Sequence, residues 1–268
     1  MKITQPVREQ LAWAFANIPT LQGFDVDDFS VSELPGLTNS NYRLHNRSHD
    51  WVLRLPRPQT DRFIDRGREA HNQNLAHHLG LAPQVAWRGE NGVTLTPTLR
   101  NSRTLRKGDF ANEEILRLVT DSLQRLHRGG ERFAGGDDLG ELLETHYRLL
   151  DSRQRDHFAA RMKRAERVLA GLEDDEQERV PSHRDLVLEN LLLEGERLQI
   201  IDWEYSAMAS PYWDLATICN EAGLDPAQSR RLLRAYCADG PAMQESMLLD
   251  YREILKLFSD CWMAALAG

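Results

Sequence analysis

The chain has 268 residues and a formal net charge of −8, with 41% hydrophobic and 28% charged residues. These values are typical of a globular protein with a large core. They exclude a general basic surface for nucleic acid, and no run approaches the roughly 18 apolar residues of a membrane span. Three widely separated cysteines and a first stretch without a signal-peptide core predict a cytoplasmic protein without disulfides.

The first hundred residues combine strand patterns with helical patterns. Short or alternating apolar runs indicate strands, and apolar residues three or four apart indicate helices. We expect a small lobe over residues 1–98, built from an antiparallel sheet and a helix. Its elements are a helix at 5–17, strands at 29–34, 42–44 and 51–55, a helix at 61–79, and a hairpin of 84–87 with 93–96.

A short polar turn joins the first two strands of this lobe. Its side chains are small, so backbone N–H groups can approach the oxygens of a phosphate. A plain hairpin turn explains the same residues, and the turn alone does not decide between the two readings. The candidates for phosphate binding are Gly36, Thr38, Asn39, Ser40 and Asn41.

Lysine is rare in this chain and occurs only at positions 2, 107, 163 and 256. None follows a glycine in a G-x-x-x-x-G-K-[ST] loop, which excludes a P-loop enzyme. None lies on the expected early strands either. Any cation of the first lobe that binds nucleotide phosphates must therefore be an arginine, and Arg54 lies on the strand at 51–55.

From Asp109 onward the chain is predominantly helical. His127 ends the first of these helices in the motif Gln-Arg-Leu-His, and a lone histidine there is expected to be structural. Asp214 opens a later helix, where it can cap the N-terminus or hold the preceding loop. The helices are expected at 110–127, 139–150, 157–171, 225–237 and 241–266.

The most informative stretch runs from Ser182 to Tyr205. A loop with Asp185 and Asn190, five residues apart, precedes a short strand, a turn and a second strand that ends at Asp202. A β-hairpin of these strands brings Asp202 back toward the loop. This set suits phosphoryl transfer, because one carboxylate can accept the proton of an attacking hydroxyl while the other acid and the amide oxygen hold Mg²⁺.

From His183 to Asn190 the loop matches the catalytic pattern H-R-D-x-x-x-x-N, and the motif I-D-W-E-Y begins at Ile201. With these motifs the chain resembles the choline/ethanolamine kinase family, in its thiamine kinase-like branch, within the aminoglycoside phosphotransferase and protein-kinase-like superfamily. The resemblance implies an α+β fold with two lobes. Residues 1–98 would bind the nucleotide and residues 99–268 would provide catalysis and the substrate site, with ATP and Mg²⁺ as cofactors.

The resemblance also implies a role for each motif residue. Asp185 orients and deprotonates the alcohol, and Asn190 and Asp202 hold the metal. Arg54 stands where the pattern has lysine, and Glu69 is the expected partner in the strand–helix ion pair. The small polar turn covers the phosphates, and Asp214 is structural. Substrate contacts are expected from Asp185, Trp203, Glu204, Tyr205, Glu221 and Trp262.

These assignments predict an ATP-dependent kinase for the hydroxyl of a small cationic alcohol of the choline, ethanolamine or thiamine type. Aromatic rings beside acids suit a compact cation. Two alternatives stay open: an aminoglycoside phosphotransferase, and a kinase-like binding module without turnover. A protein kinase is disfavoured, because Trp203-Glu204 replaces Phe-Gly and no Ala-Pro-Glu follows. We expect no nucleic-acid or membrane partner, and the sequence does not predict an oligomeric state.

Overall fold

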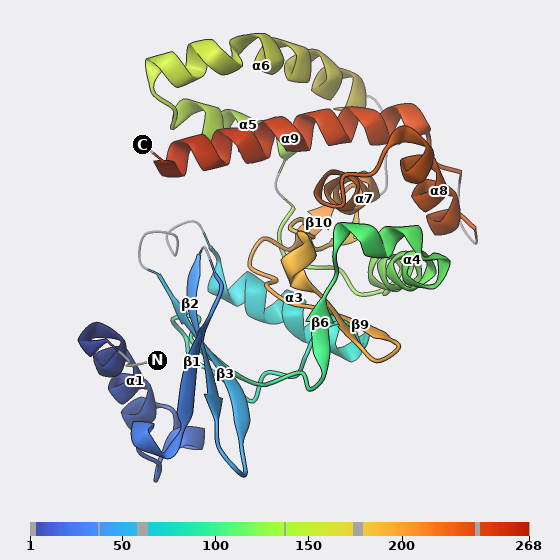
Figure 1. Cartoon of the computed structure of the whole chain (residues 1–268). Coiled ribbons are helices and arrows are strands. Elements are labelled where there is room, and N and C mark those ends of the chain that lie inside the picture. Colours follow the sequence, from blue (N-terminus) through green and yellow to red (C-terminus); the bar gives the residue numbers. More distant parts are fainter. Residues whose placement is uncertain are drawn as a thin grey trace. The chain divides into compact units, whose positions relative to one another are not determined.

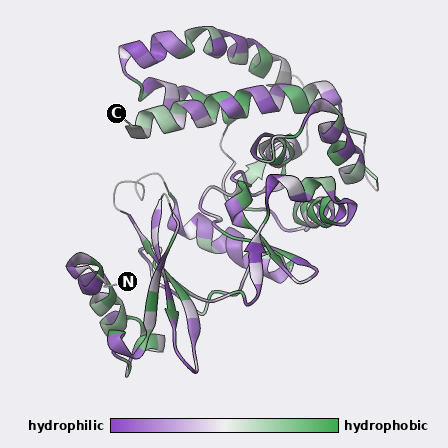
Figure 2. Ribbon diagram, in the orientation of Figure 1, coloured by the Kyte–Doolittle hydropathy of each residue, from purple (hydrophilic) through white to green (hydrophobic). Residues whose placement is uncertain are grey.

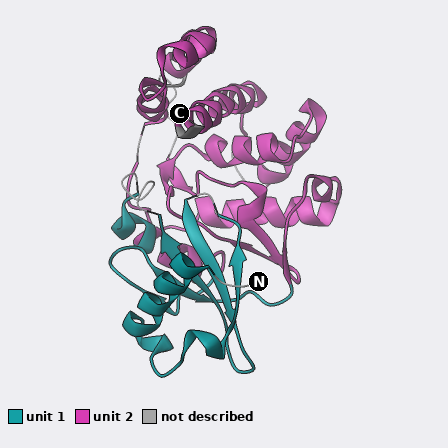
Figure 3. Cartoon of the chain, turned by 60° about the vertical axis from the view of Figure 1, so that its left-hand side comes forward, with its two compact units in different colours: residues 1–70, 83–101 teal, residues 71–82, 102–268 magenta. Residues whose placement is uncertain are grey.

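The computed structural model describes residues 4–36, 38–57, 64–136, 138–173, 179–238 and 242–267. The chain forms two compact units (Figure 3). Unit 1 consists of residues 1–70 and 83–101, and unit 2 of residues 71–82 and 102–268. The assignment of nucleotide binding to residues 1–98 and of catalysis to residues 99–268 stays a prediction.

Unit 1 is built on a five-stranded antiparallel sheet in the order β1-β2-β3-β5-β4. Figure 1 labels its first three strands. Side chains alternate between its faces, so that Trp51, Leu53 and Leu55 of one strand are buried together. They share a core with Leu11 and Phe15 of the first helix. The elements are α1 Gln5–Asn17, β1 Ser30–Leu34, β2 Asn39–His45, β3 Asp50–Pro56, β4 Trp87–Arg88 and β5 Thr94–Pro97.

Several expected boundaries of this unit differ from the structure, and the strand expected at 84–87 is β4, Trp87–Arg88. β2 begins at Asn39 rather than at Tyr42, because the backbone of residues 39–41 already pairs with β3. The polar turn is therefore shorter than the sequence suggested. The helix expected at 61–79 is α3, Arg66–His78. Residues 61–63 lie outside the described residues.

Unit 2 is mostly helical. Its longest described helix, α9, packs against α7, α5 and α6, while α4 packs against α8. α6 begins at Ser152, earlier than expected, and is largely hydrophilic along its length (Figure 2). Within the described ranges, no helix is both long and apolar enough to cross a membrane. The helices are α4 Glu113–His127, α5 Leu139–Arg148, α6 Ser152–Glu173, α7 Pro211–Glu221, α8 Pro226–Tyr236 and α9 Glu245–Ala267.

Two small antiparallel sheets in unit 2 carry the loops that matter for function. One has the order β6-β8-β9, and the other pairs β7 with β10. The hairpin of β8 and β9 begins at Leu191, opposite Ile200. β9 ends there, two residues before Asp202, so this acid lies in the connection and not on the strand. The strands are β6 Ser102–Thr104, β7 Val180–Ser182, β8 Leu191–Glu194, β9 Arg197–Ile200 and β10 Ala207–Ala209.

Candidate active site

The loop after β7 brings Asp185 and Asn190 together. The side-chain amide of Asn190 donates hydrogen bonds to the backbone oxygen of Asp185 at 2.9 Å and to its Oδ2 at 3.2 Å. The backbone N–H of Ile201 donates to the backbone oxygen of Asn190 at 3.1 Å. The hairpin thus returns the chain to this loop one residue before Asp202, as its spacing predicted.

Asp214 holds the same loop from beneath. This fully buried carboxylate accepts the backbone N–H groups of His183 at 2.9 Å and Arg184 at 2.7 Å, and Nε2–H of His127 at 3.1 Å. Although burial opposes ionisation, the hydrogen bond and charge of His127 keep the pKa of Asp214 below its ordinary value. Ser210 is the N-cap of α7, so Asp214 fixes the loop and does not cap the helix.

A second layer of contacts supports Asp214. Nδ1 of His127 lies 2.7 Å from the hydroxyl of Tyr236 in α8, and both side chains are buried. Burial raises the pKa of Tyr236, so this hydroxyl keeps its proton. His127 is thus held between Asp214 and Tyr236 inside unit 2, which matches the structural role expected for this histidine.

The pKa of Asp185 lies far above its ordinary value. Burial, followed by the charges of Glu204 and Glu221, raises its pKa to about 7. Proton transfer is most effective when the pKa of the base lies near the working pH. His183 stays neutral, because burial lowers its pKa to about 4; its Nε2–H donates to Ile201 and its Nδ1 accepts the N–H of Asp185.

The oxygen atoms near Asp185 are ligands that suit a hard cation. The amide nitrogen of Asn190 is engaged by Asp185, which leaves Oδ1 as the atom of that side chain able to bind a metal. Asp202 adopts a left-handed backbone conformation (φ 67°) as the chain leaves β9. Among the described residues there is no group of three or more His, Cys, Asp or Glu side chains arranged for a metal. Mg²⁺ suits such a sparse oxygen set, since it usually completes its shell with phosphates and water.

The four residues after Ile201 do not all serve the site in the same way. Trp203 is fully buried, donates from its indole N–H to Ile200 at 2.9 Å, and packs edge-on against His183. We therefore assign it to the core and not to substrate contact, a correction of the prediction from sequence. Glu204 is also buried, but its charge acts on Asp185.

Glu221 ends α7 and is partly exposed. Burial and the charge of Glu189 raise its pKa, while Lys107 lowers it. Both Glu189 and Lys107 were missed as neighbours by the sequence reasoning, because they approach Glu221 from other elements. Tyr205 and Trp262 are partly exposed, and their part in substrate binding stays a prediction.

In unit 1, Arg54 of β3 pairs with the buried carboxylate of Glu69 in α3. The same carboxylate binds Arg66 at 2.7 Å and lies 3.8 Å from Arg88. Although burial opposes ionisation, the charges and hydrogen bonds of Arg54 and Arg66 keep the pKa of Glu69 below its ordinary value. Arg66 and Arg88 were not predicted; the three-residue spacing of Arg66 and Glu69 on a helix was the available signal.

The polar turn of unit 1 is closely packed on itself. A Cβ added at Gly36 would lie 2.6 Å from the backbone oxygen of Asn39, so only glycine fits there. The side chain of Asn41 donates to the backbone of Pro35, and that of Asn39 donates to Thr38. Thr38 and Asn39 are buried. Phosphate binding by these residues and Ser40 stays a prediction.

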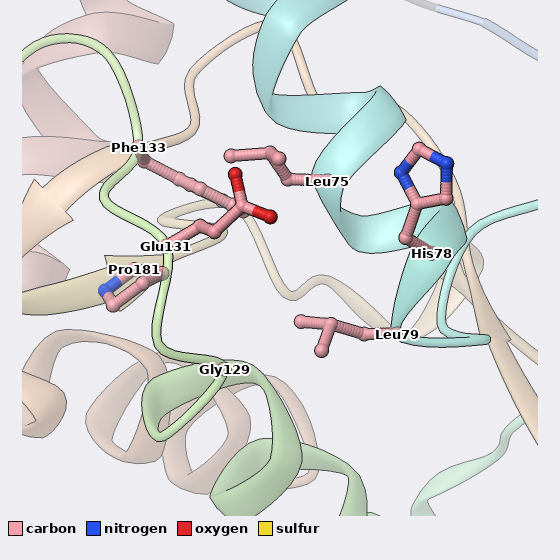
Figure 4. A pocket seen from close by; sticks show the side chains of 7 residues that line it. All are labelled: Leu75, His78, Leu79, Gly129, Glu131, Phe133 and Pro181. Carbon is pink, nitrogen blue, oxygen red and sulfur yellow. The ribbon is translucent and has the colours of Figure 1, made fainter.

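A separate small pocket lies within unit 2, between the end of α3 and the segment that follows α4 (Figure 4). None of the predicted site residues lines it. Its walls are formed by Leu75, His78, Leu79, Gly129, Glu131, Phe133 and Pro181.

Comparison with known proteins agrees with this geometry. Residues 30–246 match the phosphotransferase enzyme family. Protein LicA of Haemophilus influenzae is 33% identical over 210 residues, which cover 77% of this chain and 62% of that protein. LicA of a second Haemophilus influenzae strain is 34% identical over 205 residues, covering 75% of this chain and 77% of that protein.

Solved structures show the same fold. The choline kinase LicA from Streptococcus pneumoniae superposes with a TM-score of 0.85 at 22% identity, covering 97% of this chain and 91% of that chain. A choline/ethanolamine kinase family protein from Mesorhizobium loti gives a TM-score of 0.80 at 26% identity, covering 97% and 86%. The family match and the fold identify a phosphotransferase. The chain belongs to the phosphotransferase enzyme family.

Proposed function

We propose that this protein is an ATP-dependent kinase that transfers the γ-phosphate to the hydroxyl of a small cationic alcohol of the choline type. The observation that carries the proposal is the setting of Asp185. This carboxylate is held by Asn190, its pKa is raised to about 7, and Glu204 and Glu221 add negative charge around it. A base for the hydroxyl and an attraction for a cation thus occur at one place.

Asp185 would accept the proton of the alcohol as its oxygen attacks phosphorus. Asn190 and Asp202 would hold Mg²⁺, which when bound neutralises charge on the phosphates. In unit 1, Arg54 would bind phosphate oxygens with its planar guanidinium, oriented by Glu69. Most of the rate would come from positioning and charge neutralisation, because phosphoryl transfer needs little covalent chemistry from the protein.

Similarity supports the choice of substrate class. The solved structures described above carry the names choline kinase and choline/ethanolamine kinase. The carboxylates near Asp185 attract a cation by charge, whether or not the cation can donate a hydrogen bond. This suits a quaternary or a primary ammonium group. Dependence on Mg²⁺ and a cytoplasmic location are part of the same proposal.

The test is ADP release from ATP and Mg²⁺ with choline, ethanolamine, thiamine and kanamycin offered in turn. We expect turnover with one small cationic alcohol and a loss of about a thousandfold or more in Asp185→Ala. Asp156→Ala, an exposed aspartate of α6, is the matched control and should retain activity. Turnover with kanamycin alone would identify an antibiotic kinase, and nucleotide binding without transfer to any alcohol would indicate a binding module.

A further inference from the structure

The residue before the catalytic aspartate has an unusual backbone conformation. Arg184 has a φ of 70°, in the left-handed region that most residues other than glycine and asparagine avoid. Among the described residues only Asn101, Arg184 and Asp202 combine a side chain with a positive φ. Because Arg184 directly precedes Asp185, this strained turn sets the direction in which the catalytic carboxylate leaves the backbone.

Three contacts hold the turn, and all come from two adjacent residues of α7. The N–H of Arg184 donates to Oδ1 of Asp214 at 2.7 Å. Its backbone oxygen accepts the indole N–H of Trp213 at 3.0 Å. Its guanidinium carbon lies 4.3 Å from the centre of the Trp213 ring, well within the range of a cation–π interaction. We refer to the two contacts between Arg184 and Trp213 as the clasp.

The clasp rests on a rigid support. Trp213 is buried, with 4% of its surface exposed, and packs edge-on against Phe258 of α9 with 6.3 Å between ring centres. α7 begins at Pro211 behind the cap of Ser210 and packs along α9. A ring held in this way cannot follow a shifting loop, so it acts as a fixed platform for the guanidinium.

We propose that Trp213 and the side chain of Arg184 are positioning residues for phosphate transfer. The clasp offsets the strain of the left-handed turn and so fixes the orientation of Asp185. This positioning role rests on the proposed kinase function only for the predicted effect on kcat.

The test uses the full chain with Arg184→Gln, Trp213→Phe and the double variant. We expect each single change to lower kcat by about 10- to 100-fold while the KM for ATP and alcohol changes less than about threefold. The kcat of the double variant should lie within about threefold of the kcat of the less active single variant, because both changes loosen the same turn. Arg161→Gln, which removes a guanidinium 5.8 Å from the ring of Phe158 in α6, is the matched control.

Glycine at position 184 separates positioning from general damage. Arg184→Gly loses the stacking but accepts a positive φ without strain, so it should recover at least about threefold in kcat over Arg184→Gln. A disrupted fold would show no such recovery. Thermal unfolding of each variant confirms that the comparison is made between folded proteins.

Hydrogen exchange of the backbone supplies a readout that does not depend on activity. The N–H groups of His183 and Arg184 are bound to Asp214, and we expect them to exchange at least about tenfold faster in Arg184→Gln and Trp213→Phe than in the wild type or the Arg161→Gln control. Unchanged exchange, or faster exchange with unchanged kcat, would overturn the positioning role. A wild type that phosphorylates no alcohol would instead refute the proposed function, and the exchange data would still decide whether the clasp holds the loop.

Discussion

Replacing Asp185 with asparagine should abolish phosphate transfer and yet stabilise the folded protein at alkaline pH. The reason is the cost of keeping a charge in this place. Burial and the charges of Glu204 and Glu221 raise the pKa of Asp185 from 3.8 to about 7. Between these two pH values the folded chain binds a proton that the unfolded chain has released, so the stability of the wild type falls as the pH rises through this window. Asparagine does not titrate and avoids the loss.

The size of the effect follows from the shift. Each tenfold change in proton affinity corresponds to about 1.4 kcal/mol. The rise of the Asp185 pKa from 3.8 to about 7 therefore limits the gain in unfolding free energy to about 4 kcal/mol. Asp185 is partly exposed, so water screens part of the electrostatic cost. We therefore expect Asp185→Asn to raise the free energy of unfolding by about 1–2 kcal/mol. For a chain of this size that raises the midpoint of thermal unfolding by about 2–6 °C.

Thermal unfolding of the wild type, Asp185→Asn and the surface control Asp156→Asn, at pH 5 and pH 8 without nucleotide or metal, measures this directly. The gain of Asp185→Asn over the wild type should be larger at pH 8 than at pH 5, because at pH 8 the wild-type carboxylate is mostly ionised in the folded state, whereas at pH 5 it is mostly protonated. Asp156→Asn should show no such dependence on pH. If Asp185→Asn unfolds below the wild type at pH 8, or if its gain is equal at the two pH values, the reasoning fails.

Three further outcomes are expected. Asp214→Asn leaves buried N–H donors without a charged acceptor and should lower the free energy of unfolding by about 3 kcal/mol in urea titrations. Tyr236→Phe removes the hydrogen bond to His127 and should cost about 1 kcal/mol in the same assay, with kcat nearly unchanged. Glu69→Gln releases the orientation of Arg54, so steady-state kinetics should show the KM for ATP raised about tenfold with kcat less affected.

The part of the site that follows from sequence is the part built from local contacts. Asp185 and Asn190 are five residues apart, and a single hairpin returns the chain to Asp202, so spacing and a turn are enough to bring them together. The alternating strands of unit 1 are local in the same way, whereas the pairing of Arg54 with Glu69 was expected from the family resemblance.

Contacts between distant segments could not be predicted in this way. The sequence left open whether Asp214 caps its helix or holds the preceding loop, and its contact with His127 across 87 positions left no periodic signal. The assignment of Trp203 to the substrate failed for a related reason, because a large ring after the end of a strand can face the core or the solvent with the same sequence pattern. Arg88 reaches Glu69 from another strand and left no signal.

The buried carboxylate of Asp214 has a consequence for how this protein can change over time. The catalytic loop is secured from inside, by His127, Tyr236 and Trp213, none of which needs to touch an alcohol. Exposed residues that neither hold this loop nor act on the charge of Asp185 are therefore free to vary without disturbing the loop. Mutation can retune which alcohol is accepted while the reaction itself is inherited intact.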